Sequence, residues 1–212
     1  MKKKWIMPIG LLTAFVLWTV AVTRIDVAPI GPNGSEVGFA TLNGWFHRLT
    51  GVHMTLYTIT DWLGLVPIAV ALGFAVLGLC QWIKRRSVLR VDRSILVLGG
   101  FYLAVMVVYL FFEVVVINRR PVLIEGYLEA SYPSSTTMLV LCVMPTAMLQ
   151  FHDRIQRRFV RRCVLLLIAV FTAFMVIGRL CSGVHWITDI IGGGLISASL
   201  VMAYVSIIYP KK

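Results

Sequence analysis

The stretch GRLCSGVHWITDIIGG, residues 178–193, joins two long apolar segments and places charged and titratable side chains between them. His185 and Asp189 are four residues apart at the start of the second segment, so a helix there puts both side chains on one face. The carboxylate can then accept the Nδ1 proton of His185 and leave Nε2 free to attack or to take a proton. Arg179 ends the preceding segment, and the short turn after it is expected to bring the guanidinium beside His185. The stretch therefore predicts a polar site between two apolar helices.

The composition around this site is that of a membrane protein. The chain has 212 residues, of which 59% are hydrophobic and 14% charged, and its mean hydropathy is +0.88. A soluble domain is excluded on these values. The segments with the length and apolarity of spanning helices are 5–23, 62–83, 95–117, 137–151, 163–181 and 186–208. We expect one domain, 1–212, with an all-α fold: a six-transmembrane-helix bundle whose fourth helix, which contains Pro145, is longer than its hydropathy indicates or kinked.

The net charge of +11 indicates the membrane topology of the chain and not a nucleic-acid partner. The basic residues lie in short clusters between apolar segments, and no nucleic-acid-binding motif accompanies them. Most of them fall on one side of the predicted bundle: Lys2, Lys3, Lys4, Lys84, Arg85, Arg86, Arg90, Arg93, Arg154, Arg157, Arg158, Arg161, Arg162, Lys211 and Lys212. The other side holds Arg24, Arg48, Arg119, Arg120 and Arg179. The positive-inside rule then places both termini in the cytoplasm and the polar site outside. The four cysteines have no metal-ligand spacing, so the sequence supports neither a zinc site nor a disulfide framework.

The longest connection, residues 24–61, is too apolar for a simple linker. Phe39, Leu42, Phe46 and Leu49 recur at helical spacing. We expect a short helix there that lies in the membrane interface or caps the bundle. Tyr132 and Trp186 are interpreted as aromatic anchors at that interface.

Two further segments on the same side have the chemistry of an anion site. Residues 118–121 contain Arg119 and Arg120, whose guanidinium groups suit phosphate oxygens. Residues 132–138, YPSSTTM, open the fourth helix, with Ser134 as N-cap or Pro133 as the start of the turn. Free backbone amides at a helix N-terminus attract an anion. Together with residues 178–189, these segments predict a phosphate site that contains a histidine.

These three segments resemble the signatures of the type 2 phosphatidic acid phosphatase family. The third signature is matched by Gly178-Arg179, five residues, His185, three residues and Asp189; the end of the first by Arg120-Pro121; and the second by Pro133-Ser134-Ser135-Thr136. The resemblance implies a six-helix membrane phosphatase with the helical core of bacterial acid phosphatases and vanadium haloperoxidases. It also implies catalysis through a phosphohistidine, without metal or cofactor, on a lipid phosphate.

The resemblance assigns a role to each site residue. His185 is the nucleophile and Asp189 orients it. Phosphate is bound by Arg120 and Arg179, with Arg119, Ser134 and Ser135 in support. The resemblance also places the protein in a bacterial plasma membrane as a multi-pass protein with its site on the extracytoplasmic face. The sequence leaves the oligomeric state open.

Three positions depart from the family pattern. Glu113 stands where the family has a lysine, Gly178 where it has a serine, and Thr136 where it has the histidine that protonates the leaving oxygen. A threonine hydroxyl is no general acid near neutral pH, and general acid catalysis contributes roughly 10²–10⁴ in rate. A lipid diphosphate such as undecaprenyl diphosphate depends less on that acid than a phosphatidate-type lipid does, since its leaving group is already a stable phosphate anion.

Several alternatives remain open at the level of sequence. The missing acid is replaced by His47, His53, Glu125 or Glu129, or the chain is a pseudo-enzyme that binds lipid phosphate without turnover. A lipid translocator is disfavoured because no inverted repeat is visible. A purely structural polar network between two helices would leave Arg120 and the Ser-rich helix start unexplained.

Overall fold

The computed structural model describes residues 2–209, and Lys211 and Lys212, which the charge pattern places in the cytoplasm, lie outside them. The described chain is all-helical, as the sequence predicts, and contains no β-strand. Its α-helices are α1 (Ile6–Arg24), α2 (Ala40–Thr50), α3 (Met54–Leu63), α4 (Leu65–Arg85), α5 (Arg93–Val114), α6 (Ser135–Arg154), α7 (Arg158–Cys181) and α8 (Ile187–Ile208). Single turns of 3₁₀-helix occur at Lys2–Trp5, Pro32–Gly34 and Val88–Arg90.

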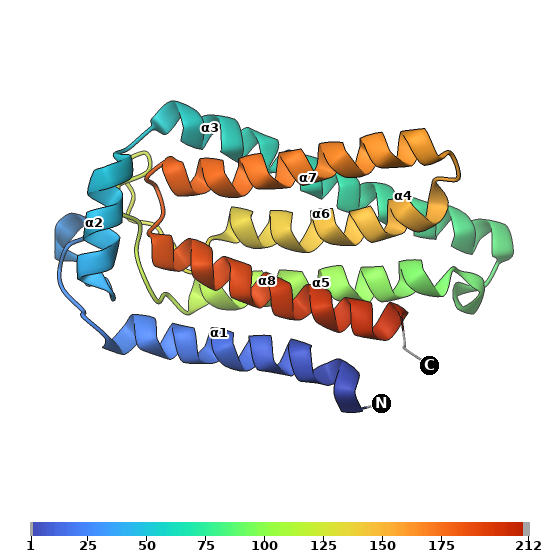
Figure 1. Cartoon of the computed structure of the whole chain (residues 1–212), viewed down its shortest axis with the longest axis horizontal. Helices are drawn as coiled ribbons and strands as arrows, with labels where there is room; N and C mark the ends of the chain where they lie inside the picture. Colours follow the sequence, from blue (N-terminus) through green and yellow to red (C-terminus); the bar gives the residue numbers. More distant parts are fainter. Residues whose placement is uncertain (1, 210–212) are drawn as a thin grey trace.

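Five helical segments of the described chain are long and apolar enough to cross a membrane. They are α1, the continuous pair α3 and α4, α5, α7 and α8. The sixth predicted segment forms α6, which is 20 residues long but does not reach the same hydropathy. It lies in the middle of the bundle, where α4, α5, α7 and α8 pack against it (Figure 1). A helix surrounded by protein does not need an apolar surface all round, which accounts for its polar residues.

Polar side chains of α6 are bonded within the bundle. Gln150 donates from Nε2 to the hydroxyl of Tyr204 on α8 at 2.7 Å, and Thr146 lies 3.2 Å from the hydroxyl of Tyr102 on α5. The helix continues through Pro145 and runs further than the predicted 137–151 at both ends. Burial of such polar groups is tolerated because each has a partner.

The first and last helices run side by side along the bundle (Figure 1). Trp18 donates from its indole nitrogen to the carbonyl of Thr188 at one end, and Ser206 donates to the carbonyl of Lys4 at the other. The start of α1 and the end of α8 therefore lie at the same end of the bundle, together with the α4–α5 and α6–α7 connections (Figure 1).

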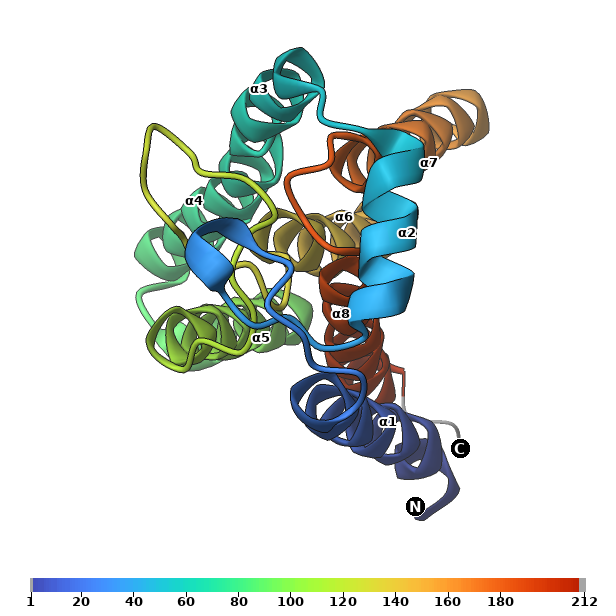
Figure 2. The same cartoon turned by 90° about the vertical axis from the view of Figure 1, so that its left-hand side faces the viewer.

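The opposite end is covered by the long first connection, and the short helix predicted there is confirmed. Helix α2 crosses this end of the bundle (Figure 2). Its Asn43 is 1% exposed and bonds to Thr188 on α8, with Nδ2 donating to Oγ1 at 3.0 Å. A Cβ atom at Gly38 would lie 1.6 Å from the carbonyl oxygen of Val22, so only glycine allows this close approach to α1. The connection is thus packed against both α1 and α8.

Candidate active site

The predicted site segments meet at the end of the bundle that α2 covers. They are the residues after α5, the start of α6, the end of α7 and the start of α8 (Figure 2). The turn between α7 and α8 is fixed by the first connection, because the backbone amide of His53 donates to the carbonyl of Ser182 at 2.9 Å. Gly183 has a φ of 70° and a Cβ there would lie 1.9 Å from the carbonyl oxygen of Gly51, so this contact requires glycine.

Arg179 is almost fully buried, with 2% of its surface exposed. Its Nη2 donates to Oδ1 of Asp61 on α3 at 2.8 Å and to Oγ1 of Thr136 on α6 at 2.5 Å. The guanidinium carbon lies 4.8 Å from the centre of the Tyr57 ring, within the range of a cation–π contact. The guanidinium is therefore held in one orientation by side chains of two helices, α3 and α6.

The glycine before Arg179 is explained by the packing of α3. A Cβ atom at Gly178 would lie 2.7 Å from Cγ2 of Thr60. The family serine does not fit here without movement of α3, the helix that carries Asp61.

Arg120 reaches the same place from the segment after α5. It is 8% exposed, its Nε lies 3.0 Å from Oε2 of Glu129, and its guanidinium carbon is 5.8 Å from the Tyr57 ring. Both predicted arginines therefore contact one aromatic ring, and each has one carboxylate as counter-ion. Asp61 and Glu129 remain about half exposed. The positive charge of each arginine is therefore only partly compensated within the site.

His185 and Asp189 are close, but not in the direct hydrogen bond that their spacing predicts. Nδ1 of His185 lies 3.8 Å from Oδ2 of Asp189. Asp189 instead accepts the backbone amide of Trp186 at Oδ2 (2.9 Å) and Nδ2 of Asn118 at Oδ1 (3.3 Å). A carboxylate in the first turn of a helix satisfies the free amides of that turn, and here this interaction takes precedence over the imidazole. Burial of His185 lowers its pKa to about 4, so the ring is uncharged at neutral pH.

Ser134 and Ser135 open α6 as predicted, with Ser134 at the N-cap position. The Ser134 side chain makes no capping bond, which corrects the predicted cap interaction, and its backbone amide donates to the carbonyl of Asp189 at 3.1 Å. The start of α6 is thereby joined to the start of α8. The first-turn amides of α6 point away from the helix without an intrahelical acceptor.

Several buried nitrogen atoms in this cluster have no hydrogen-bond partner within residues 2–209. They are Nη1 of Arg120, Nε and Nη1 of Arg179, and both ring nitrogens of His185. Buried polar groups are normally paired, and an unpaired donor costs about 1–3 kcal/mol. A cluster of unpaired donors with two guanidinium charges fits an anion with several acceptor oxygens.

A polar cavity of about 450 Å³ opens onto this cluster. His185, Arg120 and Ser135 line it together with Glu113, Glu129 and Arg119. Arg119 directs Nη1 to the carbonyl of Leu128 at 2.9 Å, so its guanidinium is occupied outside the cluster. Glu113 forms no ion pair within the described chain.

Of the side chains proposed to replace the missing acid, only Glu129 lines this cavity. His53 is exposed and bonds to the carbonyl of Thr50, and Glu125 lies in an exposed turn at positive φ. His47 packs against the Trp186 ring at 5.5 Å and lines a separate pocket. The described residues contain no group of three or more His, Cys, Asp or Glu side chains placed to hold a metal.

Five residues of the site were not predicted, or were predicted in another role. Asp61 and Tyr57 contact the predicted residues but lie outside the three motifs, and Asn118 lies in the first motif but was given no role. The sequence contains one signal for a role of Asp61 in the site, which is the position of this carboxylate at the edge of an apolar segment. The predicted interface anchors Tyr132 and Trp186 are 1% and 2% exposed, so that interpretation is wrong: the first stacks on Phe15, and the indole of the second donates to the carbonyl of Arg119.

Comparison with known proteins finds a family model that matches the second part of the chain. The family model described as the PAP2 superfamily matches residues 115–212. The PAP2 region contains all three motif segments and helices α6, α7 and α8, whereas α1 to α5 precede it.

Comparison with solved structures supports the PAP2 fold over nearly the whole chain. A transmembrane PAP2-type phosphatidylglycerolphosphate phosphatase from Bacillus subtilis is similar with a TM-score of 0.55 and 20% sequence identity, over 98% of each chain. At this identity the likeness concerns the fold alone. A comparison with curated protein sequences finds no match.

Proposed function

We propose that the protein is a membrane lipid phosphatase that removes phosphate from a lipid phosphate or diphosphate through a phosphohistidine on His185. The observation that carries the proposal is the group of unpaired buried donors on Arg120, Arg179 and His185. Arg120 and His185 line one polar cavity, and Arg179 contacts the same Tyr57 ring as Arg120. The match of residues 115–212 to the PAP2 superfamily model, the apolar helices around the cavity and the likeness to a PAP2-type phosphatase fold support the same conclusion.

In the proposed reaction, Nε2 of His185 attacks phosphorus, and the bond from phosphorus to the leaving oxygen breaks. The neutral ring has its lone pair available, and Asp189 stabilises the positive charge that develops on the imidazole. Water then attacks the phosphohistidine, releasing inorganic phosphate and free His185. Arg120, Arg179 and the first amides of α6 stabilise the phosphoryl oxygens in both steps.

Thr136 determines which substrates this site handles best. Its hydroxyl is bonded to Arg179, so it supports the phosphate-binding guanidinium and supplies no acid. Glu129 is ion-paired with Arg120 and is already occupied as a carboxylate. A leaving group that needs no protonation is therefore favoured, and we place a lipid diphosphate such as undecaprenyl diphosphate ahead of phosphatidate-type monoesters.

The side of the membrane is part of the proposal. Exposed basic residues gather at the end of the bundle opposite to the cavity, in the α4–α5 and α6–α7 connections. Under the positive-inside rule that end is cytoplasmic, with both termini, and the cavity faces outward. In this arrangement six spans cross the bilayer of a bacterial plasma membrane: α1, the continuous pair α3 and α4, α5, α6, α7 and α8.

The proposal is tested with purified protein in detergent, given lipid monophosphates and diphosphates side by side. Release of inorganic phosphate should be greater with the diphosphates, should persist with chelator, and should be lost in His185→Ala. His152→Ala is the matched control, because this exposed histidine lies at the other end of the bundle. Equal turnover by His185→Ala and the unaltered protein would exclude His185 as the nucleophile.

Thr136 also favours a second function, a pseudo-enzyme that binds lipid phosphate without turnover. The same assay separates the two. A protein that binds lipid diphosphate through Arg120 and Arg179 but releases no more phosphate than His185→Ala is a binder.

A further inference from the structure

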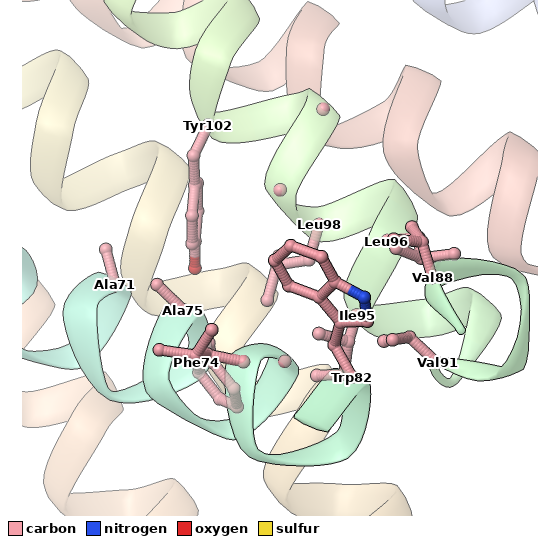
Figure 3. A pocket seen from close by; sticks show the side chains of 14 residues that line it. Ala71, Phe74, Ala75, Trp82, Val88, Val91, Ile95, Leu96, Leu98 and Tyr102 are labelled. Atoms are coloured by element: carbon pink, nitrogen blue, oxygen red, sulfur yellow. The ribbon is translucent and has the colours of Figure 1, made fainter. Parts of the chain in front are cut away.

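A second cavity lies at the opposite end of the bundle from the polar site. It has a volume of about 410 Å³ and is formed between the second half of α4 and the first half of α5. Phe74 and Trp82 from α4 and Ile95, Leu98 and Tyr102 from α5 surround it (Figure 3). We call this cavity the α4–α5 groove.

The groove is hollow because its walls carry small residues. Ala71, Ala75 and Gly78 line it on α4, and Gly99 and Gly100 on α5. A Cβ atom at Gly99 or Gly100 would meet no atom within 4 Å, so these glycines do not serve close helix packing. Both are exposed, as are Leu79 and Leu96 beside them, so the groove is open on the lateral surface of the bundle. In a bilayer that surface faces lipid chains.

The connection that closes one end of the groove is strongly basic. Val88 and Val91 of this connection line the groove, and Arg86, Arg90 and Arg93 lie beside them in the sequence, all exposed. The neighbouring Arg85 and Arg154 share Asp92 as their counter-ion, at 3.0 and 3.4 Å. Among the described residues Arg86, Arg90 and Arg93 form no ion pair. Three guanidinium groups without a counter-ion therefore lie in the connection that closes one end of the α4–α5 groove.

We propose that the α4–α5 groove binds an anionic glycerophospholipid. One acyl chain lies between Phe74 and Trp82 on α4 and the glycines of α5, and the anionic headgroup contacts Arg86, Arg90 and Arg93. Charge complementarity selects the occupant: the guanidinium groups favour net negative charge, and basic pockets between helices are a recurrent recognition mode for anionic headgroups. This site shares no residue with the polar cavity and does not rest on the proposed phosphatase function.

Trp82 provides the measurement, because its ring is in the groove wall (Figure 3). The full-length protein is reconstituted in phosphatidylcholine vesicles that contain a small fraction of lipid brominated on its acyl chains, either phosphatidylserine or phosphatidylcholine. The quenching due to Trp82 is the difference between the unaltered protein and Trp82→Phe. We expect it to be at least five-fold more sensitive to brominated phosphatidylserine, since each basic residue near a membrane surface contributes roughly five-fold to anionic lipid binding.

Two sets of variants make the test specific. Arg86→Gln, Arg90→Gln and Arg93→Gln together should abolish the preference for phosphatidylserine, whereas Arg158→Gln, Arg161→Gln and Arg162→Gln together, which remove the same charge at the same end from α7, should retain it. Gly99→Leu should lower quenching by both lipids, because the side chain fills open space. Equal quenching by the two lipids in the unaltered protein, or equal loss in both arginine sets, would overturn the proposal.

Discussion

His185 combines near-complete burial with the absence of a direct hydrogen bond. Burial lowers its pKa from 6.5 to about 4, so between these pH values the unfolded chain binds a proton that the folded chain does not. Above about pH 6.5 the buried ring therefore does not lower the free energy of unfolding. As the pH falls from 6.5 towards 4, the unfolded chain takes up the proton and the free energy of unfolding decreases progressively. Thermal unfolding in detergent should show a Tm that falls from pH 7.5 to 4.5 more steeply in the unaltered protein than in His185→Gln. Parallel curves would contradict the buried neutral state.

Thr136 is the residue at which an acid can be introduced. In Thr136→His, an imidazole would stand next to Arg179 at the start of α6, able to donate a proton to a leaving alkoxide. Phosphate release from a lipid monophosphate is expected to rise by roughly 10²-fold or more, and release from a diphosphate to change little. The readout is the ratio of the two rates in parallel assays. Thr136→Ser, which keeps the hydroxyl bonded to Arg179, is the control; a rise of both rates by the same factor would exclude the acid role.

Residue spacing predicted Arg120, Arg179, His185 and Asp189 together because each motif lies at a helix end, and helix ends of one bundle face meet. It did not predict Asp61 or Tyr57, which reach the site from α3, an element that only tertiary packing brings near. The prediction of a His185–Asp189 hydrogen bond was wrong for a local reason. Spacing of i and i+4 places two side chains on one face of a helix, but it does not determine which donor binds to the carboxylate.

At the scale of elements, hydropathy predicted the lipid-facing helices, but it underestimated the length of the central helix, α6. Segment 137–151 corresponds to α6 at 135–154, whose polar residues face other helices and not lipid. The predicted segment 62–83 contains a helix boundary at Gly64, where α3 ends and α4 begins. Since both halves are apolar, no change in composition marks this boundary. The break positions Asp61 and Tyr57 at the site.

Contact between α8 and the second motif depends on Gly192. A Cβ atom there would lie 2.6 Å from the ring of Tyr132, whose hydroxyl is 2.7 Å from Oγ1 of Thr19 on α1. Gly192→Ala should displace Tyr132 and the motif that follows it, costing about 1–3 kcal/mol of stability and lowering phosphate release. Gly194→Ala is the control on the same helix, because its Cβ would meet nothing within 4 Å; it should keep or slightly raise the Tm. Similar Tm values for the two variants would contradict this account of the contact.

At the scale of the whole molecule, the site is assembled from parts of the chain far apart in sequence. The region that matches the PAP2 superfamily supplies both arginines and His185, but Asp61, Tyr57 and the contact through Asn43 come from residues before it. Helices α2 and α3 therefore contribute contacts to the candidate site.

The proposed orientation can be measured on the intact molecule. Glu36→Cys places an exposed thiol at the end of the bundle that holds the polar site, and Gln156→Cys places one at the basic end. In intact cells a membrane-impermeant maleimide should label the first variant well above the background of the native cysteines, and label the second only after the membrane is permeabilised. The reverse pattern would show that the cavity faces the cytoplasm.

The pairing of α1 with α8 also has a consequence for biogenesis. Lys4, Pro8 and Trp18 are bonded to Ser206, Ser199 and Thr188, so α1 contacts α8, which leaves the ribosome after all the helices between them. During synthesis α1 therefore stays in the membrane without α8. The first connection also lacks a partner at that stage, since Asn43 bonds to Thr188. Packing of α1 and of the first connection is completed only once α8 has been made, so the end of the bundle that α2 covers cannot form before α8.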